Sequence, residues 1–283
     1  QELFSLPSFL YFLLDEEQEQ ILPWEADKET LCVGEFAKQR GAEVVSRVVS
    51  SAKSWLSHAS VDRRSKLLPL CSEQEDSKIS PVEVTKHLLK YLKNAWNEAM
   101  EDAPFESQKI IVTVPASFDP DARQLVEEAA KEAGYPQDMI LMEEPLAAFY
   151  SWLQQHEDSW REHLTVGDQV LVADIGGGTT DFTLISVEQK EGNLELERVA
   201  VGNHLLLGGD NMDLTLAYAM RMRFEEEGHD IDQWQMQHLI HQCRQAKELL
   251  LSKEAEEMTI TIQGQGSGLI GGAISVVLER EEA

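Results

Sequence analysis

The chain has 283 residues, of which 42% are hydrophobic and 27% are charged, so it is able to bury a sizeable core and is long enough for two domains or lobes. Its 51 acidic residues outnumber its 24 basic residues and give a formal net charge of −27. Such a charge repels phosphodiester backbones and anionic membrane surfaces, and we expect neither nucleic-acid nor membrane binding.

Residues 1–79 have the mixed pattern of an α/β subdomain. The apolar run Phe9–Leu14 has no basic region before it and acidic residues directly after it, which indicates a buried strand near Pro7–Leu14 and not a signal peptide. We expect a turn at Pro23–Asp27 and a helix from Val44 to His58. Charges or prolines interrupt every long apolar run, so none reaches the roughly 20 residues of a membrane-spanning helix.

Residues 80–100 are predicted to form one helix, because Ser80 is a suitable cap and Pro81 fits the first turn. Its apolar residues recur on one face; they are Val84, Leu88, Leu89, Leu92 and Trp96. The almost wholly apolar run Lys109–Pro115 then has the length of a strand and is typical of a strand covered on both faces.

A strand–helix cycle follows. Asp119 is a cap, Pro120 begins a helix and Gly134 ends it. The cycle repeats with a strand at Met139–Met142 and a helix at Pro145–Leu153, which predicts a parallel sheet with crossover helices. The polar segment Gln154–Gly167 is the expected boundary between lobes.

The rest of the chain is predicted to begin with strands and to continue mainly with helices. The expected elements are a hairpin formed by Gln169–Asp174 and Thr179–Val187, a strand at Leu194–Gly202, helices at Asn211–Gly228 and Asp232–Ser252, and strands at Thr259–Ile262 and Ala273–Leu278 around the glycine-rich turn Gly264–Gly272.

The strongest chemical signal is a buried strand that ends in Asp174, followed by three glycines at 176–178, Thr179 and Asp181. Consecutive glycines permit positive φ and bring backbone N–H groups close to phosphate oxygens, and the Thr179 hydroxyl is a further donor. The two carboxylates are suited to holding Mg²⁺ through its waters and to orienting an attacking water. A tight turn that merely tolerates glycine is the alternative, but it would not require acids on both sides.

Four ordered segments resemble the nucleotide-binding (ATPase) domain of the heat-shock 70-kDa chaperone (DnaK-like) family. They are Ile111–Ala116, Glu143–Ala148 with the sequence Glu-Glu-Pro-Leu-Ala-Ala, Asp174–Asp181, and Leu207–Asp213 with the sequence Leu-Gly-Gly-Asp-Asn-Met-Asp. Leu6–Leu10 and Val49–Lys53 resemble the family more weakly. The likeness covers essentially the whole chain and is closer to divergent bacterial members than to housekeeping chaperones. It implies an α/β, two-lobed actin-like ATPase (ribonuclease H-like) fold with mixed sheets and crossover helices.

The resemblance also implies how the lobes divide. Lobe I would comprise residues 1–166, with a peripheral subdomain IB at 1–79 and a core subdomain IA at 80–166. Lobe II would comprise 167–283, with part of core subdomain IIA at 167–205 and subdomain IIB at 206–283.

By resemblance, the site residues have separate roles. Lys53, Glu144, Asp174, Thr179 and Asp181 would be catalytic, and Asp174 and Asp181 would hold Mg²⁺ through water. ATP or ADP would lie against the remaining residues of the site, which are Gly176, Gly177, Gly178, Thr179, Thr180, Gly208, Gly209, Arg244 and Lys247. Pro115 and Pro145 would belong to an interlobe switch. From the residues alone, Lys53 also fits a surface lysine, Pro145 a first-turn proline and Gly208-Gly209 an ordinary turn.

The chain departs from the family in two respects. Its adenosine helix reads Arg244-Gln-Ala-Lys247-Glu248-Leu-Leu-Leu251 where the family has Glu-Arg-Ala-Lys-Arg-Thr-Leu-Ser, so among the polar positions only the lysine is kept, charges are swapped and the serine is a leucine. The family's first phosphate hairpin, Asp-x-Gly-Thr-Thr, and its later Gly-Gly-x-x-Arg loop have no counterpart here. We expect a fold that is incomplete, truncated at both ends, and very slow turnover by this piece because half of the phosphate clamp would be absent.

The leading hypothesis is therefore a stress-response chaperone domain in which ATP hydrolysis controls lobe closure. Its expected partners are nucleotide and, outside this sequence, a peptide-binding domain, a co-chaperone or an exchange factor. A sugar or small-molecule kinase of the same fold is the alternative, as is a degenerate interaction protein without turnover.

The three cysteines, Cys32, Cys71 and Cys243, lack CxxC spacing, which suits a reducing cytoplasm. His238 and His241 share a helix face, but Cys243 lies about 200° around the helix from His241, so a joint metal site is not expected.

Overall fold

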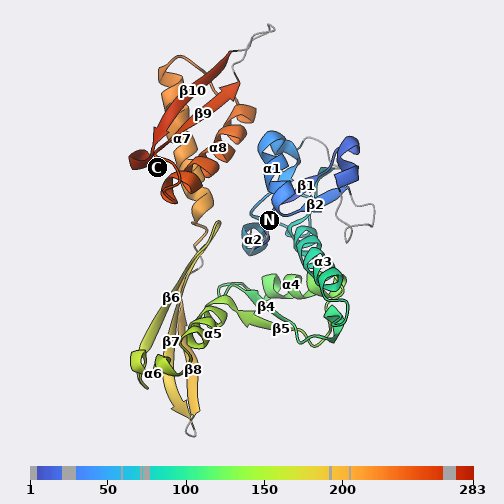
Figure 1. Ribbon diagram of the computed structural model, residues 1–283, viewed down its shortest axis with the longest axis vertical. Coiled ribbons are helices and arrows are strands. Elements are labelled where there is room, and N and C mark those ends of the chain that lie inside the picture. Colours follow the sequence, from blue (N-terminus) through green and yellow to red (C-terminus); the bar gives the residue numbers. More distant parts are fainter. Residues whose placement is uncertain are drawn as a thin grey trace.

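The computed structural model describes residues 5–20, 30–58, 60–70, 72, 77–190, 193–203, 205–263 and 272–283. Helices connect four small sheets within these ranges, which confirms the expected α/β class (Figure 1). The expected turn at Pro23–Asp27 and most of the turn at Gly264–Gly272 lie outside the described residues. No helix in the described part of the chain is long and apolar enough to cross a membrane.

The first sheet has the order β2-β1-β3 and is antiparallel throughout. Leu10 and Tyr11 of its central strand are completely buried. The elements of this part are β1 (Leu10–Phe12), the 3₁₀ helix η1 (Asp15–Gln20), β2 (Leu31–Val33), α1 (Glu35–Glu43), the 3₁₀ helix η3 (Val45–Arg47), β3 (Val48–Val49) and α2 (Ala52–Ser57).

The single helix expected from Val44 to His58 is wrong. Val48 and Val49 instead pair with Tyr11 and Leu10 and form β3. Two consecutive β-branched residues favour this pairing over a helix. Ser51, with φ of 57°, turns the chain out of β3 and into the short helix α2. Lys53 therefore lies in a helix of six residues that starts directly beside a sheet.

Helix α3 (Pro81–Ala99) has the predicted cap. The Ser80 hydroxyl accepts a hydrogen bond from the Glu83 N–H at 3.2 Å, and the Glu83 carboxylate accepts one from the Ser80 N–H at 3.1 Å. This reciprocal pair satisfies two of the free donors at the start of the helix. The predicted apolar face is only partly buried: Val84 is inaccessible, whereas Leu92 and Trp96 remain exposed.

The strand–helix cycle is confirmed, because β4 and β5 run parallel with α4 as the crossover. The expectation that β4 is covered on both faces is wrong, since Ile111 and its partner Ile140 are 47% and 40% exposed. The elements are the 3₁₀ helix η5 (Phe105–Ser107), β4 (Ile111–Val114), α4 (Pro120–Glu132), β5 (Ile140–Glu143), α5 (Glu144–His156), the 3₁₀ helix η6 (Glu157–Ser159) and α6 (Trp160–His163).

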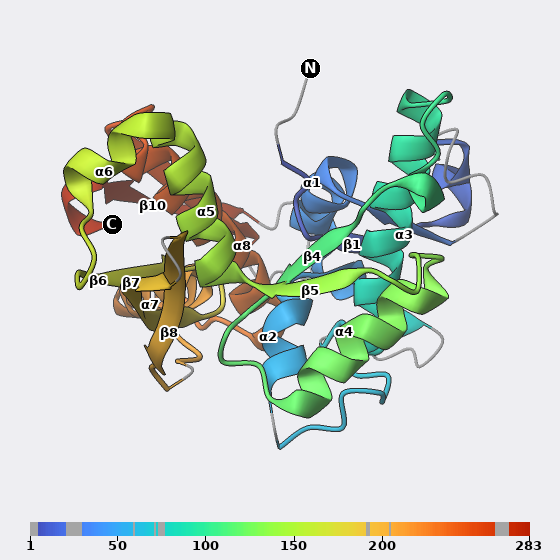
Figure 2. The same cartoon turned by 90° about the horizontal axis from the view of Figure 1, so that it is seen from below.

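An antiparallel sheet with the order β6-β7-β8 follows, as expected. Helix α5 lies alongside it (Figure 2). The elements are β6 (Gln169–Ile175), β7 (Thr180–Lys190) and β8 (Asn193–Val201), then α7 (Gly209–Glu226), α8 (Gln233–Leu251), β9 (Glu257–Gln263), β10 (Ala273–Glu279) and the 3₁₀ helix η7 (Arg280–Glu282).

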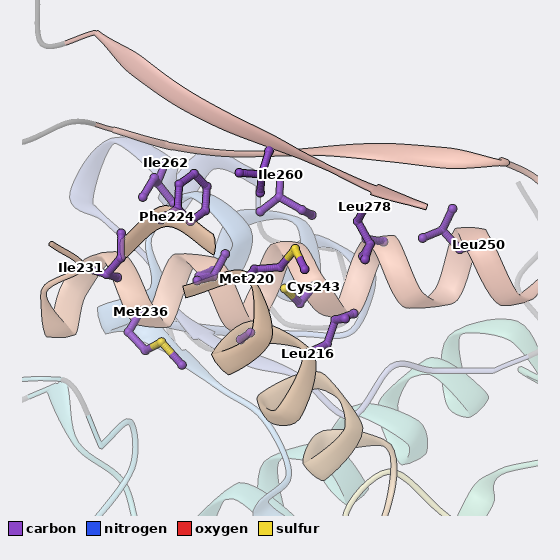
Figure 3. Packing of buried hydrophobic residues seen from close by; sticks show 14 residues of the cluster. Leu216, Met220, Phe224, Ile231, Met236, Cys243, Leu250, Ile260, Ile262 and Leu278 are labelled. Atoms are coloured by element: carbon purple, nitrogen blue, oxygen red, sulfur yellow. The ribbon is translucent and has the colours of Figure 1, made fainter. Parts of the chain in front are cut away.

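The C-terminal part of the chain has its own core, in which α7 and α8 pack against the β9–β10 hairpin (Figure 3). Phe224, Leu239 and Cys243 are completely buried in it. Burial raises the pKa of the Cys243 thiol to about 12, which disfavours the thiolate that a metal site needs. Cys243 is therefore a packing residue.

Candidate functional site

The glycine hairpin between β6 and β7 packs on the turn that begins α7. The Gly209 N–H donates to the Gly176 carbonyl at 3.1 Å, and the Asp210 N–H donates to the Gly177 carbonyl at 2.6 Å. On the β7 side, the Thr180 hydroxyl donates to the Leu207 carbonyl at 2.8 Å. The two glycine-rich segments that the sequence predicted for phosphate binding therefore form one continuous backbone surface.

Close contacts surround one glycine of this hairpin and one glycine of the turn before α7. The described glycines with positive φ are Gly34, Gly134, Gly167 and Gly228, so the hairpin glycines do not use the positive φ that their sequence permits. A Cβ at Gly178 would lie 1.8 Å from the Ser54 hydroxyl oxygen, and a Cβ at Gly208 would lie 2.5 Å from the Gly176 and Gly177 carbonyl oxygens. A side chain at Gly208 would meet backbone atoms and force the two segments apart, whereas one at Gly178 would first displace the Ser54 side chain of α2.

Three predicted catalytic residues form a charged cluster. Lys53 Nζ donates to Glu144 Oε1 at 2.7 Å and to Oε2 at 3.0 Å. Burial raises the pKa of Glu144; Lys53 opposes this shift, and the nearby Asp174 carboxylate adds to it. The cluster thus joins α2, the start of α5 and the end of β6.

Asp181 completes the carboxylate set from the neighbouring strand. Asp174 and Asp181 are direct partners in the β6–β7 register, so their side chains lie on the same face of the sheet. Asp181 is 4% exposed, as is fitting for an oriented ligand, and Thr179 is also buried. Like charges at opposed positions destabilise a sheet, and a cation bound beside them would relieve that repulsion.

The donor set fits Mg²⁺ held through its waters. The carboxylates of Asp174, Asp181 and Glu144 offer hard oxygen ligands. Lys53 pairs with one of these carboxylates, that of Glu144. No group of three or more side chains in the described ranges is close enough to enclose a metal ion directly. Mg²⁺ commonly keeps several waters and uses one or two carboxylates, which agrees with such an open arrangement.

The predicted adenosine-contacting residues Arg244 and Lys247 both contact α7. Arg244 Nε donates to Asp213 Oδ2 at 2.7 Å, and Lys247 Nζ lies 2.6 Å from Asp213 Oδ1. Lys247 also donates to the Gly209 carbonyl at 3.0 Å. Because Asp213 is 1% exposed, two cations compensate one buried carboxylate and fix α8 to the turn below the hairpin.

A cavity of about 200 Å³ lies beside this ion cluster, between the N-terminal sheet with α2 and the face of α8. The Arg244 guanidinium lies 5.7 Å from the centre of the Phe9 ring, within the range of a cation–π interaction. The side chains that line the cavity include Phe9, Val49, Trp55, Leu68, Ile240 and His241.

The two prolines predicted for a switch follow adjacent strands. Val114 and Glu143 are register partners, so Pro115 and the first turn of α5 with Pro145 leave the sheet at the same edge. Glu143 ties this edge to distant segments, because its carboxylate accepts hydrogen bonds from Arg123 at 3.2 Å and from Arg198 of β8.

Residues missed from the sequence join these segments. The Ser51 hydroxyl donates to the Asp210 carboxylate, which also accepts from Arg244. Ser54 lies over Gly178. Asp213 anchors both cations of α8. Ser51 and Ser54 are neighbours of Lys53 in the sequence, and this proximity could have indicated that they lie near the site. The roles of Asp210 and Asp213 depend on contacts between residues more than 30 positions apart in the sequence.

This α/β arrangement, with a carboxylate-flanked glycine hairpin set against a lysine-bearing helix, is that of the actin-like ATPase fold class. The sequence profile of the Hsp70 protein family matches residues 25–282, and the chain belongs to that family. It is 29% identical over 193 residues to the chaperone protein DnaK of Psychrobacter cryohalolentis. That match covers 66% of this chain and 28% of the DnaK sequence, so the chain spans less than a third of its curated relative.

Proposed function

We propose that this chain is the nucleotide-binding part of an Hsp70-type chaperone, which binds ATP with Mg²⁺ and hydrolyses it. The observation that carries the proposal is the convergence of Lys53, Glu144 and the Asp174–Asp181 pair at the end of the glycine hairpin. Membership of the Hsp70 family supports the same reading and disfavours the sugar-kinase alternative.

In this proposal each residue has a defined task. Backbone N–H groups of Gly177 and Gly178 and the Thr179 hydroxyl would bind phosphate oxygens, while the Gly176 N–H closes the hairpin by donating to the Thr179 carbonyl at 2.8 Å. Asp174 and Asp181 would hold the water shell of Mg²⁺, which would neutralise phosphate charge when bound. Lys53 would place the attacking water, with Glu144 positioning its ammonium group. Thr180, Gly208 and Gly209 shape the backbone under the phosphates, and Arg244 and Lys247 support that backbone from α8.

We further propose a division into two lobes, 1–166 and 167–283, whose closure reports nucleotide state, with Pro115 and Pro145 at the hinge edge. Helix α2 of the first lobe contacts the hairpin and Asp210 of the second lobe. These contacts support closure of the two lobes across the site. A peptide-binding domain, a co-chaperone and an exchange factor are proposed partners, and a reducing cytoplasm is the proposed location.

Nucleotide binding is tested first by calorimetric titration of Mg·ATP into the 283-residue chain, with Mg·GTP as the control. Saturable, ATP-selective heat supports the proposal. Absence of heat with either nucleotide contradicts it and would favour a chaperone-like interaction protein without turnover.

Hydrolysis is tested with Asp181→Asn under single-turnover conditions, because the sequence predicts slow turnover. Losing a carboxylate that orients the cation should lower the hydrolysis rate by about 100-fold or more while leaving the circular dichroism spectrum unchanged. Asp138→Asn, at an exposed position before β5, is the matched control and should hydrolyse ATP at the original rate. An unchanged rate in Asp181→Asn would remove this carboxylate from the mechanism.

A further inference from the structure

The polar segment Gln154–Gly167, the expected boundary between lobes, brings two histidines together. Helix α5 ends at His156, and Glu157, with φ of 41°, turns the chain into η6 and α6 (Figure 2). The Ser159 hydroxyl closes this turn by donating to the His156 carbonyl at 2.7 Å. His163, the last residue of α6, returns to the end of α5, so that the centres of the His156 and His163 rings lie 5.5 Å apart.

A stack of rings along α5 fixes the orientation of His156. Phe149 is buried and stacks on Trp152 with ring centres 5.9 Å apart, and Trp152 stacks on His156 at 4.2 Å. Residues three and four positions apart share a helix face, so the buried Phe149 anchors the whole stack. His156 Nδ1 also lies 2.8 Å from the Trp152 carbonyl oxygen. Because a carbonyl only accepts, the neutral His156 ring carries its proton on Nδ1 and keeps a lone pair on Nε2.

This geometry is that of a pair of metal ligands. A histidine that binds a metal usually donates its other ring N–H to a carboxylate or a backbone carbonyl, which fixes the tautomer. A metal bonded at about 2.0–2.1 Å to one nitrogen of each of two imidazoles holds their ring centres roughly 5–6 Å apart. The separation of 5.5 Å between His156 and His163, with 78° between the ring planes, fits this arrangement. Packing alone does not explain it, because His163 is exposed and gains little burial there.

The surroundings favour a cation, and the ligand type selects its class. Glu157 and Glu162 are exposed on the same segment, and the chain has a net charge of −27, so cations are attracted to it. In the described ranges no third histidine, cysteine or acid lies close enough to join the pair, so water would fill the remaining positions. Imidazole nitrogen suits Zn²⁺, Ni²⁺ and Cu²⁺, whereas Mg²⁺ and Ca²⁺ prefer oxygen ligands.

We propose that His156 Nε2 and a ring nitrogen of His163 bind one divalent transition-metal ion of the zinc type, with water completing its coordination. The bound ion joins α6 to the end of α5 and stabilises the turn between them, because an ion that binds only the folded turn favours it by mass action. This site differs in its ligand chemistry from the carboxylate set near the glycine hairpin, and it does not depend on the proposed function.

Calorimetric titration of Zn²⁺ into the nucleotide-free chain, in an excess of Mg²⁺ that occupies oxygen sites, tests the proposal. One Zn²⁺ should bind per chain, and His156→Gln and His163→Gln should each weaken binding by about tenfold or more. His229→Gln, in the turn between α7 and α8, is the matched control and should bind Zn²⁺ with the original affinity. Circular dichroism checks that each variant is folded. Absence of saturable binding, or the original affinity in His163→Gln, would overturn the site.

Long-range ¹H–¹⁵N spectra of the histidine rings test which atoms bind. The signals of His156 and His163 are assigned by their loss in the two glutamine variants. Zn²⁺ should shift the Nε2 signal of His156 while its Nδ1 stays protonated, and the His163 ring should respond at the same Zn²⁺ concentration. Loss of the Nδ1 proton of His156, or responses confined to other histidines, would refute the proposed geometry. Both measurements are made without nucleotide, so their outcome is separate from that of the ATP titration.

Discussion

His241 shows how one side chain responds to its tertiary environment. It lies on the face of α8 that lines the cavity beside Phe9 and Trp55. Burial, together with the smaller effect of the neighbouring Arg244 guanidinium, lowers its pKa to about 4. The imidazole of the folded chain is therefore neutral at pH 7. It also stays neutral at mildly acidic pH, where an exposed histidine becomes protonated.

Stability should fall with acidification through His241. In the unfolded chain this residue is protonated near its ordinary pKa of about 6.5, whereas in the folded chain it is protonated only near pH 4. The free energy of unfolding therefore decreases as the pH falls between these values. His241→Gln should flatten this dependence. Urea unfolding at pH 7, 6, 5 and 4.5 measures it, with His163→Gln at an exposed position of α6 as the control. A profile for His241→Gln that is parallel to the original one would contradict the role of this histidine.

At the scale of the element, one residue at the start of α4, Asp119, makes two stabilising contacts. Asp119 caps the helix by accepting from the Ala122 N–H at 2.6 Å, and it pairs through both oxygens with the buried Arg63 guanidinium at 2.9 and 2.7 Å. The hydrogen bonds from Arg63 lower the pKa of Asp119. The helix start is thereby fixed to the loop after α2.

Substitutions at Asp119 should separate the cap from the ion pair. Asparagine retains a capping oxygen, so Asp119→Asn should cost about 1 kcal/mol, mainly from weaker binding of Arg63. Asp119→Ala loses both contacts and should cost about 2–3 kcal/mol. The free energy of unfolding in urea measures both. Asp138→Ala, at an exposed position before β5, is the control. Equal losses in the two Asp119 variants would mean that the cap contributes nothing.

For the whole molecule, the dominant electrostatic property is the net charge of −27. Most of the ion pairs are on the surface, where each contributes little, so mutual repulsion of the excess acids should outweigh their attraction. Salt screens charges that lie more than about 10 Å apart at 0.1 M.

Raising NaCl from 20 to 200 mM should therefore increase the resistance of the chain to urea. The unfolding midpoint is the measurement, and urea is used because guanidinium is itself a salt. An equal osmolality of glycerol controls for effects unrelated to charge. A midpoint that falls with salt would show that attraction between exposed ion pairs dominates over repulsion.

The sequence by itself determined the features whose causes are local. The Ser80 and Asp119 caps fixed the starts of α3 and α4, and alternating strand and helix patterns predicted the parallel β4–β5 pair. The glycine-rich segment between Asp174 and Asp181 predicted a hairpin, which the β6–β7 pairing confirms. These predictions succeeded because hydrogen bonds and side-chain periodicity within a few residues decide them.

Only the tertiary structure decided the features whose partners are distant. Val48 and Val49 form a strand because β1 is available to pair with them, and this pairing shortens the predicted helix to α2. Gly178 lies against Ser54 of α2 with no room for a Cβ unless that side chain moves, a contact that no local pattern reveals. Arg244 supports the hairpin through Asp210 and Asp213 because α7 and α8 share a core. A sequence pattern specifies which groups a segment offers, whereas packing decides which of them meet.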